Sequence, residues 1–201
     1  MQIFIAGSHT DVGKTTISAA LCYAFGLEYF KLVQAGIPMD CERIKKLSPN
    51  TFTHPNGITL KTPASPHIAM QKEQKSYKGL EIPLPNSKSL LVESAGGLFT
   101  PLDMESCMID YLEHSKLPCL LVGGYYLGGI NHILLSVAAL KAREIPLLGI
   151  VISKTQNAQM DTFIQHYTQA KIAHFPNFSD SKNFQTLALD LKKELETLKI
   201  F

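Results

Sequence analysis

The sequence predicts an α/β fold, a single-domain three-layer sandwich in which helices cover both faces of a mostly parallel sheet. Short apolar runs alternate with stretches of helical periodicity, as expected for parallel strands joined by crossover helices. The chain has 201 residues, of which 45% are hydrophobic. This amount of apolar side chain is enough for one core and little more, so we expect one domain over residues 1–201.

The elements follow from the position of the apolar residues. Apolar runs predict strands at residues 2–6, 29–33, 89–93, 119–123 and 147–152, and a weaker one at 171–175. Residues 49–85 are rich in proline, asparagine, threonine and lysine, which predicts a surface excursion with one short helix after Pro66. Helices are expected between the strands. Apolar residues recur at helical spacing at Ile17, Ala20, Leu21 and Ala24, at Ile130, Ile133, Leu134, Val137 and Ala138, and at Leu187, Leu191, Leu195 and Leu198.

Charge and composition exclude several classes of protein. The formal net charge is +2 with acids and bases interleaved, so we expect neither a nucleic-acid partner nor a membrane partner. The four cysteines and seven histidines lack metal-ligand spacing, and the cysteines lie in or beside apolar segments, as in reduced proteins. No basic leader or spanning apolar run is present. We therefore expect a soluble, cytoplasmic protein.

Residues 7–15 read Gly-Ser-His-Thr-Asp-Val-Gly-Lys-Thr, between the first predicted strand and the first predicted helix. This is the position of a P-loop, where backbone N–H groups and the helix N-terminus bind phosphate. Lys14 would add a positive charge, and the Thr15 hydroxyl a ligand for Mg²⁺. The first glycine stands one residue earlier than the strict motif requires, so the loop is longer by one. The pattern favours a P-loop NTPase-like fold that binds a nucleotide over a purely structural turn.

A second acidic group is expected at the same edge of the sheet. The apolar run at 89–92 ends in Glu93, and Ala95, Gly96 and Gly97 follow, giving a backbone that can approach a ligand. In an open parallel sheet, ligands bind beyond the carboxyl ends of the strands. We therefore predict that Glu93 binds magnesium, the alternative being an acid at a strand end that faces water.

Five segments together resemble the dethiobiotin synthetase family. They are Gly-x-x-Thr-Asp-Val-Gly-Lys-Thr from Gly7, Pro-Ala-Ser-Pro-His-Ile from Pro63, Glu-Ser-Ala-Gly-Gly from Glu93, Phe-Thr-Pro-Leu from Phe99 and Leu-Gly-Gly-Ile-Asn-His from Leu127. Each is short, but they follow in the family's order and at about its spacing over residues 2–152.

The resemblance implies an ATP-dependent cyclo-ligase that uses Mg²⁺. Lys14, Lys31 and Thr10 match the family's catalytic residues, with Lys31 stabilising charge on a carbamate and on the transferred phosphoryl group. Without the resemblance, Lys31 could equally be an edge-strand lysine that faces solvent. The residues matching the nucleotide site are Asp11, Val12, Gly13, Lys14, Thr15, Thr16, Glu93 and Ser153, and those matching metal ligands are Thr15, Glu93 and Asp40.

The resemblance also implies the substrates and the assembly. The family carboxylates 7,8-diaminononanoate with CO₂ and closes the ring to give dethiobiotin. The N–H groups at the start of the helix after Gly128 would bind the carboxylate of a substrate held in the neighbouring subunit. The resemblance therefore implies a homodimer with composite active sites. The residues matching the substrate site are Ser65, Gly96, Gly128, Gly129, Ile130 and Asn131.

Three positions depart from the family pattern. Ser94 replaces a glycine, which is expected to shift the loop after Glu93. Ala35 replaces a hydroxyl residue that contacts the carbamate, with Gln34 next to it as a candidate substitute. Ser153 stands where an asparagine reads the adenine, so we expect weaker discrimination between nucleotide bases.

Two other classes share a P-loop. A partitioning ATPase switch has an extra lysine five residues before the loop lysine, where this chain has His9. A guanine-nucleotide switch needs Asn-Lys-x-Asp, and the nearest string, at residues 153–156, lacks the aspartate. An ATP-dependent ligase that forms an amide would have the same nucleotide site, so this alternative stays open.

Overall fold

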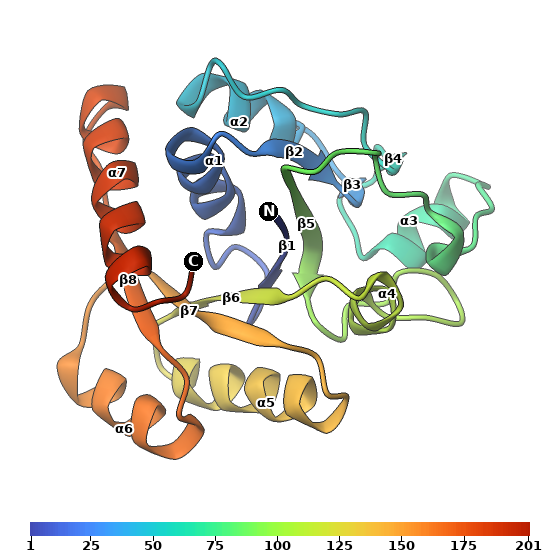
Figure 1. The fold of residues 1–201 in the computed structure, drawn as a ribbon. Coiled ribbons are helices and arrows are strands. Elements are labelled where there is room, and N and C mark those ends of the chain that lie inside the picture. Colours follow the sequence, from blue (N-terminus) through green and yellow to red (C-terminus); the bar gives the residue numbers. More distant parts are fainter.

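A computed structural model describes all residues, 1–201, and has a six-stranded sheet between two layers of helices (Figure 1). The strands are β1 (Gln2–Gly7), β2 (Glu28–Lys31), β3 (Val33–Ala35), β4 (Ile58–Leu60), β5 (Leu90–Gly97), β6 (Cys119–Gly124), β7 (Leu147–Lys154) and β8 (Ile172–Pro176). The helices are α1 (Lys14–Phe25), α2 (Asp40–Leu47), α3 (Pro66–Lys72), α4 (Met108–Ser115), α5 (Gly129–Ala142), α6 (Ala158–Thr168) and α7 (Ser181–Thr197), with one 3₁₀ turn, η1 (Gly79–Glu81).

The main sheet has the order β2-β5-β1-β6-β7-β8, and every pair in it is parallel. β1 therefore lies in the interior of the sheet, with β5 on one side and β6 on the other. Because the strands are parallel, their carboxyl ends meet at one edge, and the loops after β1, β2 and β5 lie side by side there. This point, where the strand order reverses, is where open α/β sheets bind ligands.

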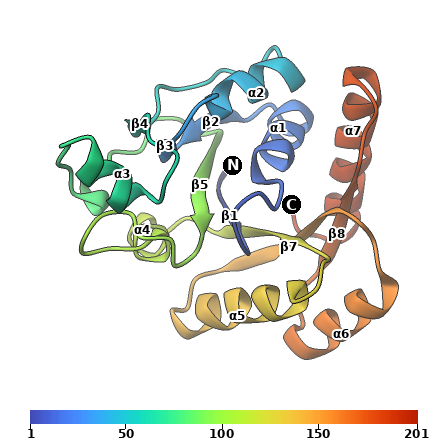
Figure 2. The same cartoon turned by 180° about the vertical axis from the view of Figure 1, so that it is seen from behind.

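Both faces of the sheet are buried, as an all-parallel sheet requires. One hydrophobic cluster joins the sheet to α4, α5 and α6, and a second, of similar size, joins it to α1, α2 and α7. Figure 2 shows α5 and α6 on one side of the sheet and α1, α2 and α7 on the other. None of the helices has both the length and the uninterrupted apolar surface that a membrane span requires. The predicted three-layer sandwich is confirmed.

The strand predicted at residues 29–33 is wrong as a single element. β2 ends at Lys31, and after Leu32 the chain leaves the main sheet and forms β3, which pairs with β4 in a separate two-stranded sheet. Leu32 joins the two sheets, because its N–H donates to Glu93 O at 3.1 Å and its carbonyl accepts from Ile58 N at 3.1 Å. The change of partner brings residues 58–60 next to the end of β2.

The excursion at residues 49–85 contains the expected helix, α3, but also β4 and η1. β4 was not predicted because three residues are too short to show an alternating pattern. β5 continues beyond Glu93 to Gly97, so the glycine-rich segment is part of the strand. The connecting helices α2, α4 and α6 were expected only in general terms, and α2 begins at Asp40.

A polar network joins β8, α6, α7 and the loop after β6. His174 on β8 places Nε2 3.1 Å from Asp161 Oδ2 on α6 and Nδ1 3.5 Å from Glu194 Oε1 on α7. Tyr125, directly after β6, donates its hydroxyl to Asp161. Glu194 and Asp161 raise the pKa of His174 above its ordinary value, although burial acts in the opposite direction.

This raised pKa predicts how stability depends on pH. Protonated His174 is stabilised in the folded state, so its contribution is complete below the unfolded pKa of about 6.5 and is lost as pH rises through the folded pKa. We expect His174→Gln to lower the free energy of unfolding more near pH 6 than near pH 8.5, measured by urea titration. His166→Gln, on the exposed face of α6, is the control; an equal effect of His174→Gln at both pH values would contradict the prediction.

Candidate functional site

The phosphate loop after β1 is curled around the side chain of Lys14. The ammonium nitrogen of Lys14 lies 3.4 Å from the carbonyl oxygen of His9, and a Cβ on Gly7 would stand 2.9 Å from the same nitrogen. Gly13 has φ 106°, and Asp11 also has a positive φ, 61°. Aspartate tolerates this left-handed conformation better than most residues, which allows the loop to hold its additional residue.

Lys14 is the least compensated buried cation of the site. Burial, followed by the charge of nearby Lys31, lowers the pKa of Lys14 to about 8. Its ammonium group forms no ion pair, and its only hydrogen-bond partner is a backbone carbonyl. A phosphate bound in the loop would supply the missing negative charge.

A proton should therefore be taken up when a triphosphate binds near pH 8.5. At this pH a Lys14 with a pKa of about 8 is largely neutral, and the bound phosphate favours its charged form. Titration calorimetry with ATP in two buffers of different ionisation enthalpy should give different heats near pH 8.5, and the difference should shrink near pH 6.5. Equal heats in both buffers near pH 8.5 would contradict the expected uptake.

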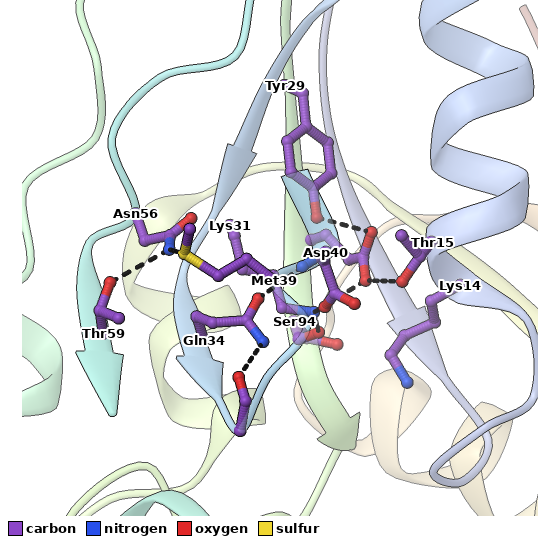
Figure 3. Close-up of polar contacts among 12 residues, drawn as sticks. Lys14, Thr15, Tyr29, Lys31, Gln34, Met39, Asp40, Asn56, Thr59 and Ser94 are labelled. Atoms are coloured by element: carbon purple, nitrogen blue, oxygen red, sulfur yellow. Dashed lines mark hydrogen bonds and ion pairs between the residues drawn. The ribbon is translucent and has the colours of Figure 1, made fainter. Parts of the chain in front are cut away.

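Glu93, within β5, is the centre of the site. Figure 3 labels its partners Thr15, Tyr29 and Lys31, whose side chains point toward one another. Its carboxylate is fully buried and accepts hydrogen bonds from Thr15 Oγ1 at 2.9 Å, from Lys31 Nζ at 2.8 Å and from Tyr29 OH at 3.1 Å. These donors come from α1 and β2. A buried carboxylate needs such partners, because an unpaired charge would be costly. The side chain of Glu93 is thus fixed in place before any ligand binds.

Lys31 lies on the edge strand β2, but the alternative in which it faces solvent is wrong, because the side chain is buried. It is 4% exposed, and its ammonium group contacts both Glu93 and, at 2.6 Å, Asp40 Oδ2. It also donates to Ser94 O at 3.0 Å. Burial alone would lower the pKa of Lys31, but Glu93 and Asp40 raise it above its ordinary value. Lys31 is therefore a permanent cation inside the cleft.

Asp40 is positioned by the loop that leads into α2. Its backbone N–H donates to Gln34 Oε1 at 2.9 Å, while Gln34 Nε2 donates to Gly36 O at 3.0 Å. Both ends of the Gln34 side chain are thus used within the loop, so Gln34 does not replace the hydroxyl that Ala35 lacks. Thr15, Asp40 and Glu93 present oxygen atoms only, which is the donor set that Mg²⁺ prefers.

These residues line one cleft of about 1460 Å³ at the carboxyl edge of the sheet. Val12 does not, because its side chain is buried in the core between the sheet and α1. Gly128 and Ile130 line a separate cavity of about 410 Å³, and Gly129 and Asn131 line neither. The predicted residues that line the cleft are Thr10, Asp11, Gly13, Lys14, Thr15, Thr16, Lys31, Asp40, Ser65, Glu93 and Gly96.

Ser153 lies against the phosphate loop. It is 6% exposed, and a Cβ on Gly13 would stand 2.5 Å from its hydroxyl oxygen. Its side chain therefore packs on the loop backbone, while the exposed Lys154 after it lines the cleft. The expected effect of Ser153 on base selectivity stays a prediction.

Ser94 lies where β5 is irregular: the strand continues to Gly97, but its register with β1 shifts between the pairs Ile5–Glu93 and Gly7–Gly97. Its hydroxyl is buried and has no hydrogen-bond partner. Gly96 has φ 63°, and a side chain there would meet Thr100, whose hydroxyl accepts from Gly97 N at 2.8 Å. Gly96, with its positive φ, contributes to the shape of this segment, and the expected effect of Ser94 on it stays a prediction.

Ser94→Ala is expected to stabilise the protein by about 1 kcal/mol, because an unpaired buried hydroxyl carries a desolvation penalty. The measurement is the free energy of unfolding from urea titration. Ser136→Ala is the control, since Ser136 is also buried but donates to His132 O at 2.8 Å. A loss of stability in Ser94→Ala would show that its hydroxyl does have a partner.

The structure also places residues in the site that the sequence did not single out. Tyr29 fixes Glu93 through its hydroxyl. Arg43 on α2 lines the cleft and donates to Thr16 Oγ1 at 3.0 Å. Tyr126 contacts both His9, at 3.2 Å, and His132, which joins the phosphate loop to α5. Their roles depend on how distant segments pack, and no local motif indicates them.

The chain is similar to known proteins over most of its length. The family model described as an AAA domain matches residues 1–184. The "ATP-dependent dethiobiotin synthetase BioD" of Campylobacter jejuni (strain 81-176) is 48% identical over 198 residues, which cover 98% of this chain and 97% of the relative. The protein of the same name from Lawsonia intracellularis is 36% identical over 201 residues and covers 98% of both chains.

Solved structures show the same fold at low sequence identity. The MinC:MinD cell division protein complex of Aquifex aeolicus gives a TM-score of 0.55 at 13% identity, covering 98% of this chain and 96% of that chain. HypB from Helicobacter pylori, solved with nickel, gives 0.52 at 14% identity, covering 98% and 86%. At these identities the similarity concerns the fold alone, which is that of P-loop proteins.

Proposed function

We propose that the cleft of this protein closes a cyclic urea on 7,8-diaminononanoate with CO₂ and ATP. The reaction follows from the family, because this chain belongs to the ATP-dependent dethiobiotin synthetase family. The products are dethiobiotin, ADP and phosphate. The observation that carries the assignment to this cleft is the convergence of Thr15, Lys31 and Asp40 around buried Glu93, beside the phosphate loop and Lys14. Cations and carboxylates lie together at the carboxyl edge of the sheet. Such a site suits a reaction between two anions, a carbamate and ATP.

The reaction begins when one amine of the substrate attacks CO₂, loses a proton and becomes a carbamate. A carbamate oxygen then attacks the γ-phosphorus, ADP leaves, and a mixed anhydride of carbamate and phosphate is formed. The second amine attacks the carbonyl carbon and expels phosphate, which closes the ring. Lys31 and Lys14 stabilise the negative charge on the carbamate and on the transferred group, and the Thr10 hydroxyl donates to the carbamate.

Positioning supplies the remaining rate. Two reacting groups that are held together lose the entropic cost of a bimolecular encounter, and ring closure then needs little acid or base catalysis. Ser65 and Gly96 line the same cleft and are assigned to the diamine end of the substrate. Thr15, Glu93 and Asp40 would hold Mg²⁺, which neutralises charge on the phosphates when it is bound.

The carboxylate end of the substrate is assigned to the start of α5 in a second copy of the chain. Gly128, at φ 91°, precedes the helix, and no side chain caps the first N–H groups of α5. Within one chain, this turn faces the smaller cavity instead of the main cleft. A homodimer that places the turn of one subunit at the cleft of the other would complete the site.

Incorporation of isotopically labelled bicarbonate into a cyclic urea tests the proposed reaction. Phosphate release should require both the diamine and bicarbonate. Phosphate release that ignores the diamine would indicate a nucleotide switch. Dependence on a different carboxylate and amine would indicate an amide-forming ligase, and either result would overturn the proposal.

Complementation between two inactive variants tests the composite site. Lys31→Met removes the cation that is paired with Glu93 and Asp40, and Asn131→Asp adds a negative charge at the start of α5 without a change of size. If the site spans two subunits, random mixing should restore about a quarter of the wild-type activity, because half of the dimers then hold one intact site. A mixture without activity, or a monomer in analytical ultracentrifugation, would contradict the homodimer.

A further inference from the structure

Arg43 is a cation of the cleft that the reaction described above does not use. It lies on α2, which packs against α1, and its guanidinium donates to Thr16 Oγ1 at 3.0 Å. No carboxylate lies within ion-pair distance of it, although α2 also carries Asp40 and Glu42. A guanidinium has five N–H donors, so most of them are free to bind a ligand.

The charges of the cleft show why a free arginine matters. Lys31 is already paired with two carboxylates, Glu93 and Asp40. Lys14 contacts only a backbone carbonyl, and Lys154 lines the cleft without a hydrogen bond to the phosphate loop. Arg43 is therefore a cation outside the loop that is held in place by the first turn of α1, through Thr16. A planar guanidinium fits two phosphate oxygens at once.

The position of Thr16 indicates which phosphate this would be. In a P-loop the lysine reaches the β- and γ-phosphates, and the next hydroxyl binds the metal that bridges them. Thr16 follows these residues, one step further along α1 and away from the γ-phosphate end. A group held at the Thr16 hydroxyl therefore stands near the α-phosphate.

We propose that Arg43 is a nucleotide-binding residue that donates to the non-bridging oxygens of the α-phosphate. This inference rests on the proposed binding of ATP in the cleft. The contact is independent of the base, so it adds equal affinity for adenine and guanine nucleotides. It also pulls α2, and with it Asp40, toward the bound nucleotide.

Calorimetry with ADP and GDP provides the first test. Arg43→Met keeps most of the apolar stem and removes the donors, and it should weaken both nucleotides by about tenfold to a hundredfold, the usual range for a charged hydrogen bond. Lys46→Met removes one positive charge from the same helix away from the cleft and should leave both affinities within about twofold. Thermal unfolding of the two variants should be alike.

The two diastereomers of ATP with sulfur on the α-phosphate provide the second test. The wild type should prefer one diastereomer, because sulfur is a weaker acceptor than oxygen and the two positions on the α-phosphate face different donors in the chiral site. Because Arg43 supplies some of these donors, Arg43→Met should change the preference. Unchanged affinity, or weaker binding with the same preference, would overturn the assignment of Arg43. If Lys14→Met also bound ADP normally, the proposed nucleotide site itself would fail, so the two failures can be told apart.

Discussion

Replacing Lys31 with methionine is expected to lower kcat by about 10²–10³ while ADP binding changes little. The ammonium group lies where a carbamate and a transferred phosphoryl group would gather negative charge, and removal of one preorganised donor has an effect of this size. Methionine keeps a similar volume, so the packing around β2 is retained. Steady-state kinetics with saturating diamine and bicarbonate measures the change.

A loss of folding must be separated from a loss of catalysis. Without Lys31, buried Glu93 and partly buried Asp40 lack their cation, and such a loss destabilises proteins by about 3–5 kcal/mol. The double variant Lys31→Met with Asp40→Asn removes one of the two unpaired charges and should regain stability without regaining turnover. Turnover near the wild-type rate in either variant would show that Lys31 is not catalytic.

Glu93→Gln is expected to raise the Mg²⁺ concentration for half-maximal turnover at least about tenfold, because a neutral amide is a much weaker ligand for a hard cation than a carboxylate. The rate at saturating Mg²⁺ should also fall, since Lys31 then pairs with Asp40 alone. The measurement is turnover against free Mg²⁺ at fixed ATP.

Tyr29→Phe is the matched control for Glu93→Gln. It removes the hydrogen bond to the other carboxylate oxygen but leaves the charge in place. A small change in the Mg²⁺ requirement is expected for this variant. If Glu93→Gln responded to Mg²⁺ as the wild type does, Glu93 would not be a metal ligand and would serve only to hold Lys31.

Local patterns were sufficient for the sheet and the phosphate loop. The apolar runs located the six strands of the main sheet, and Glu93 followed from its place directly after the apolar run at 89–92, although β5 itself continues to Gly97. The division between β2 and β3 could not be predicted, because Val33 is as apolar as Tyr29 and Phe30. Where the chain changes partners depends on residues 58–60, which pair with β3 from a distant part of the sequence.

The sequence predicted the site residues that belong to family motifs. It did not predict those that reach the site through the packing of distant segments. Lys31 and Asp40 came from the family resemblance, and the structure brings them within 2.6 Å of each other. Arg43 resembles any exposed arginine on a helix, and only the docking of α2 on α1 brings it to Thr16. For Gln34 the sequence suggested a role that the structure does not support. It was a candidate to replace the hydroxyl that Ala35 lacks, but both ends of its side chain are hydrogen-bonded within the loop before α2.

The ion pairs around Glu93 have a consequence for the order in which ligands arrive. Lys14 has no ion pair of its own, but Lys14 and Lys31 together carry as much charge as Glu93 and Asp40, so the buried part of the cleft has little net charge before a ligand binds. ATP without a metal ion, which carries about four negative charges, would be attracted only weakly to this part of the cleft. The Mg²⁺ complex of the nucleotide carries less negative charge, so we expect the cleft to bind this complex in preference to the free nucleotide. A chelator of Mg²⁺ should then inhibit turnover by lowering the concentration of the complex.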